Sequence, residues 1–145
     1  MISSVGADTN VLFSGFYYGG SARKLLELVR FGKIDFWQSE YLKDELVEIA
    51  KRNGMNLRVL GFFYPLENVH IVTDESYFSK EEFASAGKLV RDRKDVPVNV
   101  FAKKMLSLHK IDFFVTGDND LLQEDVRASL SNKIISLSEF NELAD

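Results

Sequence analysis

Two acidic residues follow a strongly apolar stretch in the last third of the chain. The segment FFVTGDNDLL, residues 113–122, places Asp118 and Asp120 one residue apart, directly after the apolar run. Both would suit a turn that closes a strand, but that interpretation leaves their mutual repulsion unexplained. Two carboxylates are tolerated side by side when a divalent cation neutralises them, and Mg²⁺ and Mn²⁺ prefer such oxygen ligands.

Three further acids lie where such a site could use them. Asp8 follows the weakly strand-like segment SSVGA, Glu45 lies inside a helical pattern, and Asp95 begins another. At about 100° per residue, Glu45 falls on the edge of an apolar stripe and points toward the margin of the core. Each acid also has an ordinary interpretation: an Asx-turn for Asp8, a solvated helix acid for Glu45 and an N-cap for Asp95.

Strand and helix patterns alternate along the chain. Strands are predicted over 3–7, 33–37, 68–72, 111–116 and 133–137. Helices are predicted over 21–30, 39–51, 56–64, 79–90, from 95 onward and over 138–143, with Ser39 as an N-cap and Gly32 as a C-terminal cap. The expected buried stripes are Ala22, Leu25, Leu28 and Val29; Leu42, Leu46 and Ile49; Phe83, Ala86, Leu89 and Val90; and Val98, Phe101, Ala102 and Met105. The segment GFYYGG is predicted to be a flexible loop.

This alternation predicts an α/β protein with three layers, α/β/α, around a central, mainly parallel sheet. The length of 145 residues suits a single domain over 1–145. Ligands of such sheets bind outside the carboxyl ends of the strands, where Asp8 and Asp118 are expected.

Composition excludes several classes of protein. The chain has no cysteine, so disulfides, thiolate zinc sites and cysteine nucleophiles are ruled out. No signal peptide or membrane-spanning run is recognisable, and we expect a cytoplasmic protein. A net charge of −4 disfavours broad electrostatic binding of nucleic acid, unless several acids are metal ligands. The sequence contains neither a Gly-x-Ser-x-Gly elbow nor a Walker-type phosphate loop.

The order of these segments resembles one known family. ADTNVLFSG, SEYLKDELVEI, RDRKDVPVNVFAKKM, DFFVTGDNDLL and IISLSEFNEL together resemble a PIN domain, and more narrowly the VapC-type toxin ribonucleases of prokaryotic toxin–antitoxin pairs. The resemblance extends from about Val5 to Leu143. It implies hydrolysis of RNA phosphodiester bonds with one or two Mg²⁺ or Mn²⁺ ions.

The resemblance also implies roles for individual residues. Asp8, Glu45, Asp95 and Asp118 match the catalytic, metal-binding acids. Asn10, Thr116 and Asp120 match groups that surround them. Val96 departs from the family, in which a small polar residue commonly follows the third acid. Lys24, Arg91, Arg93, Lys103 and Lys104 are candidates to contact RNA, although each is more often an ordinary surface residue.

Partners and alternatives follow from the same pattern. The family implies a homodimer and a protein antitoxin, and two aromatic clusters could serve as core, as a dimer contact or as a groove for the antitoxin. These clusters are Phe16, Tyr17 and Tyr18, and Phe62, Phe63 and Tyr64. Alternative functions are a PIN nuclease of rRNA or tRNA maturation, a PIN-like module that binds RNA or protein without cleavage, and a phosphoacceptor receiver domain. The receiver domain is disfavoured because its usual lysine after the last strand is missing, since Lys133 precedes the segment IISL.

Overall fold

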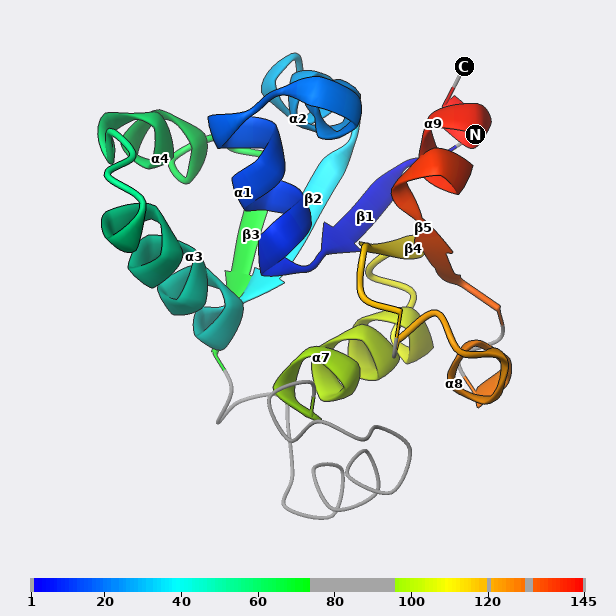
Figure 1. The fold of residues 1–145 in the computed structure, drawn as a ribbon. Helices are drawn as coiled ribbons and strands as arrows, with labels where there is room; N and C mark the ends of the chain where they lie inside the picture. The colour runs from blue at the N-terminus through cyan, green and yellow to red at the C-terminus, as the bar shows by residue number, and fades with distance from the viewer. Residues whose placement is uncertain (1, 74–95, 120, 130–131, 145) are drawn as a thin grey trace.

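A computed structural model describes residues 2–73, 96–119, 121–129 and 132–144 (Figure 1). Asp95, Asp120 and the predicted helix over 79–90 lie outside these residues. None of the described helices is long and apolar enough to span a bilayer.

The described strands form one five-stranded, all-parallel sheet with the order β3-β2-β1-β4-β5. The strands are β1 (Ser4–Ala7), β2 (Asp35–Ser39), β3 (Val69–Val72), β4 (Phe113–Thr116) and β5 (Ile134–Ser136). Helices cover both faces, which confirms the predicted three-layer α/β/α class. The chain order reverses at the central pair: β2 lies on one side of β1 and β4 on the other.

One face of the sheet packs against α1, α2, α4 and α9, with the C-terminal half of α3 (Figure 1). The bounds are Thr9–Tyr17 for α1, Arg23–Arg30 for α2, Glu40–Arg52 for α3, Arg58–Phe63 for α4 and Leu137–Ala144 for α9. A short 3₁₀ turn at Gly20–Ala22 joins α1 to α2. Val5 and Ala7 of β1 belong to this core, as does Val115 of β4.

The opposite face packs against α7 (Val96–Ser107) and α8 (Glu124–Ser129). Phe101 of α7 and Phe114 of β4 meet over Gly6 of β1. A Cβ at Gly6 would lie 3.1 Å from Phe114 and 3.2 Å from Phe101. The small residue thus lets α7 approach the centre of the sheet, close to the strand ends that carry the acids.

Two predicted caps and one predicted stripe are confirmed as they were predicted. Ser39 accepts a hydrogen bond from Leu42 N as the N-cap of α3, and Gly32 has a positive φ of 70° just after α2. The stripe of α7 is buried as predicted.

Three local predictions need correction. Within the segment GFYYGG, residues 15–17 belong to α1 and do not form a flexible loop. In α2 the buried leucines are Leu25 and Leu26, with Leu28 only half-buried, and in α3 Ala50 is buried where Ile49 was expected. The short helix α8 was not predicted at all.

Candidate functional site

Asp8 lies at the end of β1, where the strand order of the sheet reverses. Ala7 pairs with Val115 across β1 and β4, so Asp8 is level with Thr116 at the carboxyl ends of these two strands. Alternate strand residues point to opposite faces, and both side chains fall on the face covered by α7, as Gly6 and Phe114 do. This is the position at which parallel α/β sheets bind ligands.

Protein donors surround the Asp8 carboxylate, which is only 6% exposed. Its Oδ1 atom accepts from Val11 N at 2.9 Å and caps the first turn of α1. Its Oδ2 atom accepts a hydrogen bond from the Thr116 hydroxyl and one from Gly117 N, the latter at 3.3 Å. The carboxylate is therefore fixed from two strands at once.

Within the part of the chain that the structure describes, the charge of Asp8 has no ionic partner. Burial raises the pKa of its carboxyl above the ordinary value, hydrogen bonds from Thr116, Val11 and Gly117 oppose this, and the nearby charge of Asp118 raises the pKa further. Among the described residues, no lysine or arginine side chain bonds to Asp8. A buried carboxylate beside a second carboxylate is an environment that a cation would stabilise.

Backbone hydrogen bonds fix the loop that carries Asp118. The amide N of Asp118 donates to the Thr116 hydroxyl at 3.0 Å, so Thr116 joins the two acids. The carbonyl of Asp118 accepts from Leu121 N and Leu122 N, both at 3.1 Å. All three of these bonds are made by backbone atoms of Asp118, whose side chain is half-buried.

The remaining predicted acids are only partly placed. Glu45 is half-buried on α3, as the periodicity predicted, and Asn10 is exposed in the first turn of α1. Asp95 and Asp120 lie outside the described residues. Within the described ranges, no group of three or more acidic or histidine side chains is close enough to hold a metal ion. The structure thus brings Asp8, Thr116 and Asp118 together and leaves the wider four-acid site a prediction.

The predicted RNA-contacting lysines do not share one surface. Lys24 lies on α2, whereas Lys103 and Lys104 lie on α7, and these helices cover opposite faces of the sheet. Arg91 and Arg93 lie outside the described residues.

Asn99 is fully buried in α7 and was not among the residues predicted from the sequence. Neither its amide nitrogen nor its amide oxygen has a hydrogen-bond partner within the described structure. Leaving such a group unpaired is costly, so it marks either a weak point of the core or a place for a polar ligand. An asparagine at a position flanked by Val98 and Val100 was the available signal.

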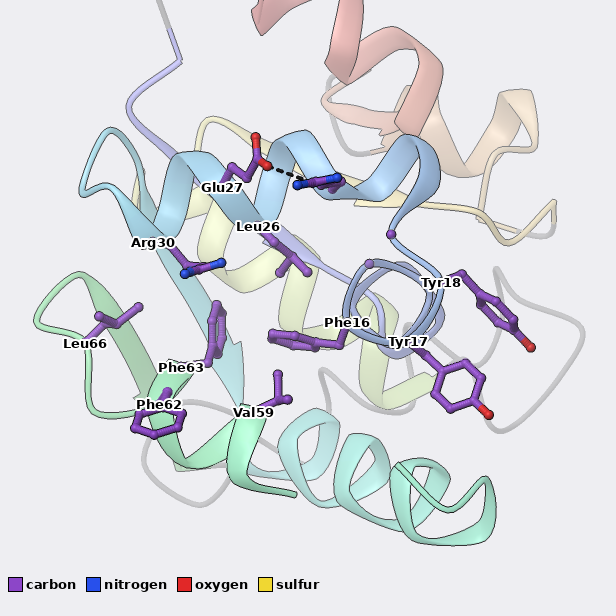
Figure 2. A pocket seen from close by; sticks show the side chains of 13 residues that line it. Phe16, Tyr17, Tyr18, Leu26, Glu27, Arg30, Val59, Phe62, Phe63 and Leu66 are labelled. Atoms are coloured by element: carbon purple, nitrogen blue, oxygen red, sulfur yellow. Dashed lines mark hydrogen bonds and ion pairs between the residues drawn. The ribbon is translucent and has the colours of Figure 1, made fainter. Parts of the chain in front are cut away.

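A second feature is an aromatic groove far along α1 from Asp8, which Figure 2 shows from close by. It measures about 750 Å³ and lies between the C-terminal end of α1, α2 and α4. Tyr18 and Phe62 on its walls are 72% and 79% exposed, and the exposed Arg30 points into it. We call this feature the aromatic groove; its lining residues include Phe16, Tyr17, Tyr18, Arg30, Phe62 and Phe63.

Comparison with models of known protein families gives no match for this chain, and comparison with curated proteins gives none either.

Proposed function

We propose that this protein is a metal-dependent endoribonuclease that acts as the toxin of a toxin–antitoxin pair. The observation that carries the proposal is the buried Asp8 carboxylate at the reversal point of the sheet, joined through Thr116 to the Asp118 loop. The resemblance of the chain to VapC-type PIN domains supplies the reaction class.

The donor set fits Mg²⁺ or Mn²⁺, because both ions favour carboxylate oxygens and Asp8 has no counter-charge among the described side chains. Asp8 and Asp118 would hold the ion, with Asp95 and Glu45 as further candidates. When bound, such an ion supplies an activated water and stabilises negative charge on a phosphoryl oxygen.

The chain's own groups set the geometry of this centre. Thr116 and Gly117 hold the Oδ2 atom of Asp8 from the β4 side, while Val11 N holds the Oδ1 atom from α1. Such fixed surroundings keep a ligand from rotating away from the metal, which is the usual role of groups that bond to metal ligands.

We also propose that the aromatic groove binds one helix of a protein antitoxin. Its three-helix walls and apolar floor suit the side chains of an amphipathic helix. Arg30 has no ionic partner among the described residues, so the expected helix carries an acidic side chain beside its apolar stripe.

Cleavage of RNA with and without metal tests the nuclease proposal. The purified protein should cleave RNA with Mg²⁺ or Mn²⁺, and EDTA should stop it. Asp118→Asn should abolish cleavage and reduce the thermal stabilisation by Mn²⁺, because that stabilisation depends on the dissociation constant. Asp44→Asn, which removes an exposed carboxylate, is the matched control and should behave as wild type. Cleavage unchanged in excess chelator would refute the proposal.

A further inference from the structure

A polar cluster beside the Asp118 loop is centred on Arg127 of α8. The Nε atom of Arg127 donates to the Leu122 carbonyl at 3.2 Å. Its Nη2 and Nη1 atoms donate to the two carboxylate oxygens of Glu139, at 2.9 Å and 3.4 Å. One planar guanidinium therefore joins the segment after Asp118 to the first turn of α9.

Glu139 is itself fixed to the end of β5. Its Oε1 atom accepts from Ser136 N, and its own N donates to Ser136 Oγ, both at 3.1 Å, which forms a capping box. Hydrogen bonding from Arg127, followed by that from Ser136, lowers the pKa of the Glu139 carboxyl. Ser136 pairs with Thr116 across β5 and β4, so the cluster is anchored beside the strand end that holds Asp8.

The other end of the cluster reaches the backbone of Asp118. Leu122 accepts from Arg127 through its carbonyl and donates to the Asp118 carbonyl through its amide, at 3.1 Å. The hydrogen bonds thus run without a break from Glu139 through Arg127 and Leu122 to Asp118. Packing alone gives α8 little restraint, because Val126 is its one buried side chain among six described residues.

We propose that Arg127 and Glu139 are positioning residues that hold the Asp118 carboxylate in place beside Asp8. This inference rests on the proposed metal-dependent function, because it assigns the pair an effect on metal binding through Asp118. An ordinary surface ion pair would have little effect of any kind. The Arg127–Glu139 pair differs in that it also bonds to a loop carbonyl.

A matched ion pair elsewhere in the chain supplies the control. Arg23 and Glu27 on α2 are joined at 2.8 Å, but the hydrogen bonds described for Arg23 include none to a loop. The variants are Arg127→Gln, Glu139→Gln and Arg23→Gln. Arg127→Lys is a milder change that keeps the positive charge and removes the planar guanidinium with its paired donors. For each, calorimetry gives the dissociation constant for Mn²⁺, steady-state kinetics give kcat and KM for RNA, and thermal melts check the fold.

We expect Arg127→Gln to weaken Mn²⁺ binding by about tenfold or more, the usual size for a group that orients a metal ligand. The value of kcat should fall while KM is unchanged, and Arg23→Gln should match wild type. In an Asp118→Asn background, Arg127→Gln should have no further effect on Mn²⁺ affinity, which a merely structural residue would not show.

Wild-type Mn²⁺ affinity in both Arg127 variants would overturn the inference. The inference would also be overturned if Arg127→Gln lowered Mn²⁺ affinity equally in the wild-type protein and in the Asp118→Asn background. If Asp118→Asn abolishes metal binding while the Arg127 variants are normal, only this inference fails. If the wild-type protein neither binds Mn²⁺ nor cleaves RNA, the proposed function fails and this inference with it.

Discussion

Asp8 combines two roles that oppose each other. As an N-cap its carboxylate stabilises α1, yet as a buried charge beside Asp118 it costs free energy. An asparagine would cap the helix almost equally well without the charge. The presence of an acid at this point is therefore better explained by a ligand than by the fold.

The pH dependence of stability should expose this cost. Burial raises the pKa of Asp8 above 3.8, so between that value and the raised one the folded state binds more protons than the unfolded state. Stability therefore falls as pH rises through this window. With chelator present, Asp8→Asn should gain in free energy of unfolding relative to wild type as pH rises from about 4 to neutrality.

Urea denaturation of both proteins at several pH values measures this difference. Asp44→Asn controls for the loss of any negative charge, because Asp44 is exposed. A difference between Asp8→Asn and wild type that is constant with pH, or that shrinks as pH rises, would show that the buried charge carries no such cost.

At the scale of elements, α7 brings its first turn to the edge of the sheet that carries the acids. A helix that leads into a parallel strand runs antiparallel to it, so the N-terminus of α7 lies at the carboxyl end of β4. Asn99 is in this part of the helix and is fully buried without partners in the described structure.

Replacing Asn99 should stabilise the protein. Leucine has nearly the same shape and removes two unpaired polar atoms, so Asn99→Leu should raise the free energy of unfolding by about 1–3 kcal/mol. Asn53→Leu is the control and should lower the free energy of unfolding, because exposed Asn53 donates to the Ile49 carbonyl at 2.8 Å. Chemical denaturation measures both, and a clear loss of stability in Asn99→Leu would mean that the amide has partners in solution.

The sequence predicted the regular elements where the apolar period was clear, as in β4 and α7. It failed at the end of α1, because the glycine and aromatic residues in GFYYGG resemble a loop. The physical reason for Gly15 is packing: a Cβ there would lie 2.5 Å from Leu26 of α2. The six-residue α8 was missed because one buried residue, Val126, gives no period to detect.

The site was predictable only in part. The alternation of strand and helix patterns along the chain was enough to predict that Asp8 and Asp118 each follow a strand. The sequence does not encode strand order locally, so the pairing of β1 with β4 and the contact of both acids with Thr116 needed tertiary structure. The link from Arg127 to Glu139 had no signal in sequence spacing.

At the scale of the whole molecule, the acids and the aromatic groove lie at opposite ends of α1. Asp8 begins the helix, and Tyr17 ends it at the groove (Figures 1 and 2). One extended partner could therefore place a helix in the groove and a following segment near the acids. We expect the protein itself to form a homodimer, as the family resemblance implies, through a surface other than the groove.

Substituting one wall of the groove should separate these two interactions. Phe62→Glu places a charge on the apolar wall and should abolish binding of the proposed antitoxin helix, measured by calorimetry. Light scattering at tens of micromolar should still show a dimer. Phe31→Glu is the matched control, since Phe31 is 71% exposed and lies outside the groove lining, and it should bind normally.

A Phe62→Glu protein that becomes monomeric would instead assign the groove to the second copy, because the charge would then lie in the dimer interface. Antitoxin binding unchanged in Phe62→Glu would contradict the groove assignment.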